Sequence, residues 1–173
     1  MKRGVSFYQI ECSLFYLINC HYNRKNWNAF FHICTHLGGA RFTIAITFGF
    51  LFYSIYSSTV LGLEMATALA ISHIPVALIK KGFPRRRPYL VLQQSNVTLN
   101  PLIDHSFPSG HTTAFFSIII PIIFQIPIIA IVLFPIAIMV GISRIFLGLH
   151  YPSDVLVGGM LGSLVGFLSV LFI

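Results

Sequence analysis

A histidine and an aspartate stand four residues apart near the C-terminal end of the chain, in the segment His150-Tyr151-Pro152-Ser153-Asp154. Pro152 suits the first position of a helix, so the imidazole and the carboxylate would meet at a helix start. A carboxylate that holds one ring nitrogen leaves the other nitrogen free to act as a nucleophile. The spacing indicates an activated histidine, although Asp154 could also serve only to complement the positive end of the helix dipole.

A second group with chemical potential is Pro108-Ser109-Gly110-His111, which stands at the start of an uncharged run. Pro, Ser and Gly suit a helix N-terminus, whose free backbone N–H groups bind phosphate oxygens. A helix cap alone explains those three residue types. It does not explain His111, an ionisable side chain at the mouth of an apolar helix, so the pattern favours an anion site.

Basic residues form a third group, with Lys80 and the run Arg85-Arg86-Arg87 after one apolar segment and Arg144 at the end of another. Cations complement the C-terminal end of a helix dipole, and long basic side chains reach the membrane edge, so a purely structural role is the alternative for each base taken alone.

The charge balance restricts the ligand of these groups. The chain has 11 Lys and Arg against 4 Asp and Glu, a formal net charge of +7. A site for Mg²⁺, Ca²⁺ or two metal ions needs several converging carboxylates, so we expect neither a metal ion nor another cofactor. Because the bases are clumped between apolar runs, we expect a compact anion such as phosphate as the partner, and no nucleic acid.

Membrane helices must hold these groups, since 56% of the residues are hydrophobic, 9% are charged and the mean hydropathy is +0.84. Gly158, Gly162 and Gly166 form a small-residue stripe that favours close helix contact. The uncharged runs predict an all-α bundle with five spans, near residues 40–56, 60–80, 109–125, 127–145 and 154–173.

The N-terminal residues 1–39 are predicted to form an interfacial, amphipathic segment outside the transmembrane core of residues 40–173. Residues 5–20 are apolar, but the stretch is short and interrupted by Gln9 and Glu11. We expect an interfacial helix there, with a sixth span as the alternative.

The connectivity of five spans places the chemistry at one membrane face. The charged loops 81–108 and 145–153 come out on the same side, because the two spans between them go and return. The opposite side receives only the short turns near Ser57 and Gln125 and the C-terminus. We therefore expect the three groups to meet at one end of the bundle.

Five further ionisable residues receive more modest interpretations. Arg85 and Arg86 could contact a second phosphate or head groups, but solvated loop charge is the simpler reading, and Asp104 reads as loop polarity. Glu64 and His73 lie within a span, where an ionisable group is costly, and no role is assigned to them.

Taken together, the motifs Lys80-x6-Arg87-Pro88, Pro108-Ser109-Gly110-His111 and Ser143-Arg144-x5-His150-x3-Asp154 resemble the type 2 phosphatidic acid phosphatase family. The resemblance covers roughly residues 40–173. The same motifs occur in soluble acid phosphatases and vanadium haloperoxidases, and the predicted spans favour the membrane branch.

The resemblance implies a metal-independent phosphatase and a role for each motif residue. His150 would attack phosphorus to form a phosphohistidine, Asp154 would orient His150, and His111 would protonate the leaving oxygen and then activate water. The phosphoryl oxygens would be held by Lys80, Arg87, Ser109, Gly110 and Arg144.

The small size resembles bacterial members that act on undecaprenyl diphosphate or phosphatidylglycerophosphate. We expect hydrolysis of undecaprenyl diphosphate to undecaprenyl phosphate, with phosphatidylglycerophosphate or phosphatidic acid as alternative substrates. The rival from another class is a non-catalytic phospholipid-binding or transport protein, and a vanadate-dependent oxidase is more distant. The expected partners are the lipid phosphate and membrane lipids, with no oligomeric state indicated. The expected location is the cell membrane, with the site on the extracytoplasmic face.

Overall fold

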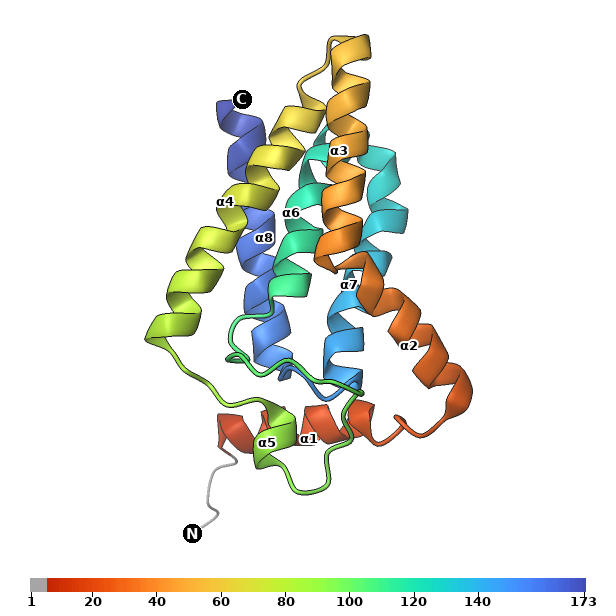
Figure 1. The fold of residues 1–173 in the computed structure, drawn as a ribbon, viewed down its shortest axis with the longest axis vertical. Helices are drawn as coiled ribbons and strands as arrows, with labels where there is room; N and C mark the ends of the chain where they lie inside the picture. The colour runs from red at the N-terminus through yellow and green to blue at the C-terminus, as the bar shows by residue number, and fades with distance from the viewer. Residues whose placement is uncertain (1–5) are drawn as a thin grey trace.

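The computed structural model describes residues 6–173, and within that range every regular element is a helix. Five helical segments form a bundle along the long axis of the molecule (Figure 1). They are α3 (Ala40–Ser57), α4 (Leu61–Gly82), α6 (Gly110–Gln125), α7 (Ala130–Phe146), which follows the short η1 (Pro127–Ile129), and α8 (Pro152–Phe172). These bounds confirm the predicted all-α bundle.

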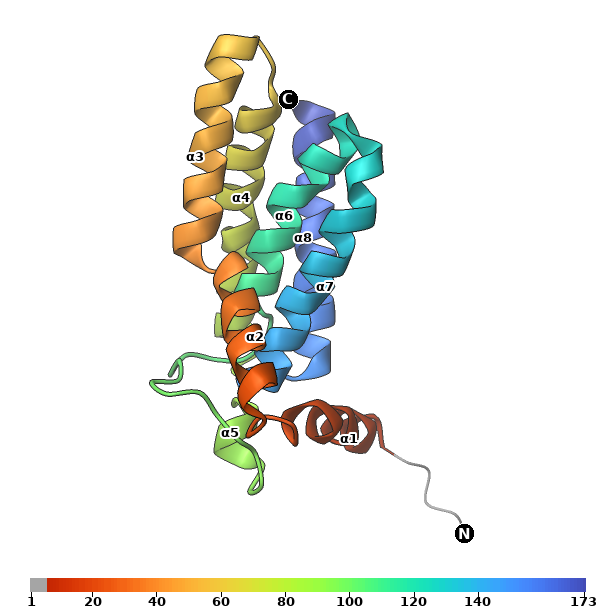
Figure 2. The ribbon, with the colours of Figure 1, turned by 90° about the vertical axis from the view of Figure 1, so that its right-hand side faces the viewer.

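The segments differ in length. Four of them, with η1 and α7 counted as one, are long and apolar enough to cross a membrane, whereas α6 has 16 residues. At about 1.5 Å per residue, α6 covers roughly 24 Å, less than the ~30 Å of a hydrocarbon core. The first turn of α6 lies deeper in the bundle than the first turn of α8 (Figures 1 and 2). The segment 109–125 is therefore a short central helix whose N-terminus is recessed.

Close contact between α6 and α8 follows from the glycine stripe of α8. A Cβ atom on Gly162 would lie 2.3 Å from the backbone oxygen of Thr113, and one on Gly158 would lie 2.7 Å from the backbone oxygen of Ser109. Any larger side chain at these positions would push the helices apart. The structure thus confirms the predicted close helix contact, which packs the start of α6 against the second and third turns of α8.

The charged segments gather at one end of the bundle, as the connectivity predicted. We call it the loop end, and it carries the loop 83–109, which includes the short helix α5 (Pro88–Val91), and the turn 147–151. The C-terminus and the α3–α4 turn lie at the opposite end (Figure 1).

Two more helices, α1 (Phe7–Asn19) and α2 (Lys25–Leu37), lie at the loop end. Helix α1 runs across the end of the bundle, under α8, while α2 is inclined beside α7 (Figures 1 and 2). The crosswise direction of α1 favours the interfacial helix over a sixth span. Residues 1–5 of the predicted N-terminal segment lie outside the described residues.

Candidate active site

The turn between α7 and α8 presents His150. Gly148 has φ +75°, and a Cβ atom there would lie 2.1 Å from the backbone oxygen of Asn96. Glycine is needed at this point because other residues adopt such a φ with strain and the loop backbone leaves no room. The tight turn leads directly into His150, whose side chain is buried.

Each ring nitrogen of His150 faces a different partner. Nδ1 lies 3.5 Å from Oδ2 of Asp154, and Nε2 lies 3.2 Å from Nη1 of Arg87. The structure thus brings the predicted histidine and aspartate together, although 3.5 Å is longer than an ordinary hydrogen bond. Burial, followed by the positive charges of Arg144 and Arg87, lowers the pKa of His150 well below its ordinary value. The imidazole is therefore neutral near pH 7, which is the state a nucleophile requires.

Asp154 is fully buried, and both of its oxygens accept hydrogen bonds. Oδ2 accepts the backbone N–H of Tyr151 at 2.8 Å, which fixes the first turn of α8. Oδ1 accepts Nη1 of Arg85 at 2.9 Å. In addition, the backbone N–H of Ser109 donates to the backbone oxygen of Asp154 at 3.0 Å. This last bond holds the start of α6 beside the nucleophile.

Lys80 and Arg87 share one anionic partner, Asp104. Arg87 is fully buried and donates to Oδ1 of Asp104 at 2.6 Å, while Lys80 pairs with the other carboxylate oxygen. Partial burial would by itself raise the pKa of Asp104, but the hydrogen bonds and charges of Lys80 and Arg87 outweigh it and lower this pKa to about 2. The interpretation of Asp104 as loop polarity was therefore incomplete, because it bridges two of the predicted phosphate-binding cations.

Arg144, near the end of α7, is a buried cation without an anionic partner in the described residues. Its side chain is 3% exposed, and Nη1 donates to the hydroxyl of Thr35 at 2.6 Å. Nε and Nη2 are buried and have no hydrogen-bond partner in residues 6–173. Unpaired buried donors of this kind are costly, and the oxygens of a phosphate would satisfy them.

The first turn of α6 carries Ser109, Gly110 and His111. Ser109 is buried, and its hydroxyl shares a hydrogen bond of 2.9 Å with the hydroxyl of Thr112. A Cβ atom on Gly110 would meet nothing within 4 Å, so open space adjoins this turn. The ring of His111 points to the turn between α2 and α3, where a Cβ atom on Gly39 would lie 3.8 Å from its Nε2. The predicted site residues therefore lie together at the loop end, although the Ser109 hydroxyl is already engaged by Thr112.

Three residues of this cluster, namely Glu11, Thr35 and Arg85, were not among the predicted site residues. The interpretation of Arg85 as solvated loop charge was wrong, because its guanidinium pairs with Glu11 at 2.5 Å and with Asp154 at 2.9 Å. Arg86 is exposed, as expected of loop charge. A lone acid in an apolar segment was the only local signal for Glu11, and nothing local marked Thr35.

Glu64 and His73 stay outside this cluster. Nδ1 of His73 lies 2.8 Å from the backbone oxygen of Leu69 on its own helix, and Glu64 is buried near the opposite end of the bundle. Within residues 6–173, no group of three or more His, Cys, Asp or Glu side chains is arranged to hold a metal ion.

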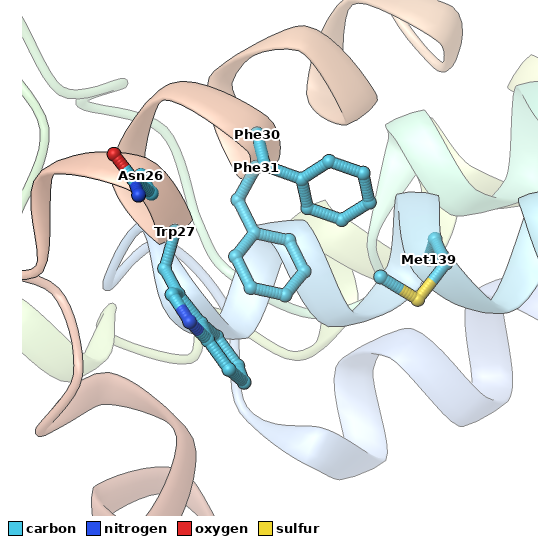
Figure 3. Close-up of a pocket in the computed structure, with 5 residues that line it drawn as sticks. All are labelled: Asn26, Trp27, Phe30, Phe31 and Met139. Atoms are coloured by element: carbon cyan, nitrogen blue, oxygen red, sulfur yellow. The ribbon is translucent and has the colours of Figure 1, made fainter.

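An apolar pocket of about 350 Å³ opens between α2 and α7. Figure 3 shows the aromatic side chains of Trp27, Phe30 and Phe31, all from α2, with Met139 of α7 across from them. Thr35, one helical turn beyond Phe31, is the residue that binds Arg144. The pocket thus lies on the same helix as the residue that binds Arg144, and its apolar lining suits a hydrocarbon chain.

Comparison with known proteins gives a family match over much of the chain. The model of the PAP2 superfamily matches residues 61–173. The undecaprenyl-diphosphatase BcrC of Bacillus subtilis is 39% identical over 79 residues, which are 43% of this chain and 41% of that protein. The chain spans about half the length, 41% to 54%, of the curated relatives it matches first.

Two solved structures share nearly the whole fold. LpxE of Aquifex aeolicus has a TM-score of 0.80 and 28% identity, over 94% of this chain and 96% of that one. A transmembrane PAP2-type phosphatidylglycerolphosphate phosphatase of Bacillus subtilis has a TM-score of 0.75 and 27% identity, over 93% of this chain and 85% of that one. The structural likeness therefore includes N-terminal elements that precede the family match.

Proposed function

Because the chain belongs to the PAP2 superfamily, we propose that it hydrolyses a lipid phosphate monoester or diphosphate at the loop end of its membrane bundle. The observation that carries this proposal is the pair of unpartnered, buried donors of Arg144 in the same cluster as the neutral, buried His150. A buried cation that lacks an anion is destabilising unless a ligand supplies one. A phosphate group supplies that charge and also an electrophile for the histidine.

In the proposed reaction, Nε2 of His150 attacks phosphorus while the bond from phosphorus to the leaving oxygen breaks. His111 donates a proton to that oxygen, and the product is a phosphohistidine. Asp154 faces Nδ1 and stabilises the positive charge that the ring acquires. Water then attacks phosphorus with His111 as the base, the bond from phosphorus to Nε2 breaks, and phosphate leaves.

The cations stabilise the charge on the phosphoryl oxygens during both steps. Arg144 offers Nε and Nη2, and Lys80 and Arg87 become available when Asp104 yields to the phosphate. Asp104 is 53% exposed, so it can move toward solvent. The backbone N–H groups at the open first turn of α6, at Gly110, add neutral donors.

The substrate we propose is undecaprenyl diphosphate, which would be converted to undecaprenyl phosphate. The name of the related BcrC of Bacillus subtilis supports this choice. An apolar pocket on α2, the helix that also carries Thr35, supports a substrate with a long hydrocarbon chain. Phosphatidylglycerophosphate is the second candidate, because a solved structure with the same fold is named for that activity. Phosphatidic acid is a further alternative.

The direct test is phosphate release by the purified protein in detergent, with each of these three lipids and with EDTA present. We expect His150→Ala to abolish release and His73→Ala, a histidine change away from the site, to leave it unchanged. Undiminished release by His150→Ala would refute the histidine nucleophile, and loss of activity with EDTA would refute metal independence. Failure of the wild type on all three lipids would favour the binding or transport alternative.

We further propose that the site faces the extracytoplasmic side of the cell membrane, as in the bacterial enzymes that the motifs resemble. The basic loops at this end would favour the cytoplasm by the positive-inside tendency, but bases required by the chemistry are poor topology signals. Single cysteines placed in loop 89–104 of a cysteine-free variant should react with an impermeant reagent in intact cells. Protection of these cysteines would reverse the orientation.

A further inference from the structure

Helix α1 places a carboxylate in contact with the active-site framework. Glu11 is 4% exposed and shares the buried face of α1 with Phe15 and Asn19. Its Oε2 accepts Nη2 of Arg85 at 2.5 Å, and its Oε1 accepts the backbone N–H of Ser153 at 3.1 Å. A buried acid is costly unless it is paired, and here both oxygens have partners. Glu11 is thus held by the residues that flank the catalytic aspartate.

Arg85 stands between Glu11 and Asp154 and contacts both. Its Nη1 donates to Oδ1 of Asp154 at 2.9 Å and to the hydroxyl of Ser153 at 2.8 Å. Its guanidinium also lies 3.9 Å above the ring of Tyr151, an arrangement typical of a cation–π contact. These contacts fix the plane of the guanidinium, so Arg85 has little freedom to turn.

The two carboxylate oxygens of Asp154 have different partners, and this difference matters for catalysis. Arg85 binds only Oδ1, and Oδ2 is the oxygen that lies 3.5 Å from Nδ1 of His150. Glu11 is the hydrogen-bond partner of the second guanidinium nitrogen, Nη2, so loss of its carboxylate would leave Nη2 free to turn toward Asp154. Arg85 could then bind both oxygens of Asp154, as arginine commonly binds carboxylates, and this would weaken the contact between Asp154 and Nδ1 of His150.

We propose that Glu11 and Arg85 are positioning residues that keep Asp154 oriented toward His150, so that α1 belongs to the active site. Glu11 acts through Arg85, and Arg85 acts through Asp154, and neither touches the reacting atoms in this arrangement. The proposal rests on the proposed phosphatase function. Glu11 lies outside the family match over 61–173, so its proposed role belongs to a residue that the family pattern does not contain.

The primary test compares Glu11→Gln with wild type in steady-state phosphate release. The amide keeps the size of the side chain and removes its charge, so we expect kcat to fall about 10-fold, the scale at which residues behind the reacting groups act. KM should stay within about twofold, because no phosphate-binding cation has changed. Glu11→Asp, which retains the charge on a shorter side chain, should recover part of the loss.

Glu64→Gln is the matched control, because it makes the same change at another buried acid, 5% exposed, at the far end of the bundle. Its kcat should equal that of the wild type. The melting temperatures of both variants in detergent show whether either one is misfolded. If Glu11→Gln fails to fold, the kcat of Glu11→Asp is compared with that of the wild type instead, and a reduced kcat is expected.

A double-mutant cycle separates positioning from general structural support. In an Asp154→Asn background, Glu11→Gln should have no further effect on kcat, because the residue through which it acts is already neutral. A full additional loss in that background would overturn the positioning role, as would an unchanged kcat in the single variant or a change confined to KM. Wild-type phosphate release combined with any of these results refutes only this proposal. No release by the wild type would instead refute the proposed function on which it rests.

Discussion

Arg144 provides a test that links the stability of the protein to its ligand. Its side chain is 3% exposed, with two nitrogens unpartnered within residues 6–173, and Arg87 adds a second positive charge to the same cluster. Arg144→Met would remove the charge and fill most of the volume. Replacing even a buried ion pair with apolar side chains stabilises some proteins by about 1–4 kcal/mol, and Arg144 lacks the anion that would offset its desolvation. Removing the partner of the Thr35 hydroxyl should cost about 1 kcal/mol.

The net expectation is that the ligand-free Arg144→Met variant is at least as stable as the wild type, with a gain of roughly 0–3 kcal/mol. For a chain of this size, each kcal/mol corresponds to about 2–4 °C in Tm. The wild type should gain about 2.7 kcal/mol from a phosphate analogue at 100 times its Kd, and the variant should gain little. The same variant should lose phosphatase activity.

The assay is thermal unfolding in detergent, with and without orthovanadate, for the wild type, Arg144→Met and Arg41→Met. Arg41 is an exposed arginine, so its replacement should preserve the vanadate response. The reasoning is refuted if Arg144→Met melts below the wild type in the absence of vanadate, or if it keeps the full vanadate shift. Either result would mean that Arg144 does not bear an unpaired charge awaiting an anion.

Four other predictions concern the site and the bundle. Asp104→Asn should lower the inhibition constant of orthovanadate several-fold, because Lys80 loses its competing carboxylate, and an increase would mean that Asp104 helps to place the cations. The pKa of Asp104 is lowered to about 2, so any difference in stability between this variant and the wild type should persist above about pH 4. The difference should diminish as the pH falls toward the lowered pKa, and acid unfolding of both proteins measures it. Gly162→Leu should destabilise the bundle by about 3 kcal/mol or more, whereas Gly49→Leu, where a Cβ meets nothing within 4 Å, should be nearly neutral by thermal unfolding. Because the pKa of His150 is lowered, the midpoint of the acid limb in the pH profile of kcat/KM should lie below the ordinary histidine pKa of about 6.5. An NMR titration of His150 with a midpoint at about 6.5 or above would contradict this.

The sequence determined the bundle and the location of the chemistry. Long uncharged runs cannot be placed in water and must cross the membrane as helices, so the spans could be predicted closely. The go-and-return path of the spans then forced the charged loops to one end. Pro152 and the Ser109-Gly110 pair marked the starts of α8 and α6, because helix caps are specified by local residue types.

Only the tertiary structure decided which side chains support the site. Glu11 and Arg85 are 74 residues apart in the chain, and Thr35 and Arg144 are 109 apart. No local spacing specifies such pairs, because they depend on how α1 and α2 pack against the loop end. Arg85 therefore looked like one more loop charge until α1 placed an acid against it. The buried, unpaired state of Arg144 likewise depends on the helices around it, and the case for an anion at this site rests on that state.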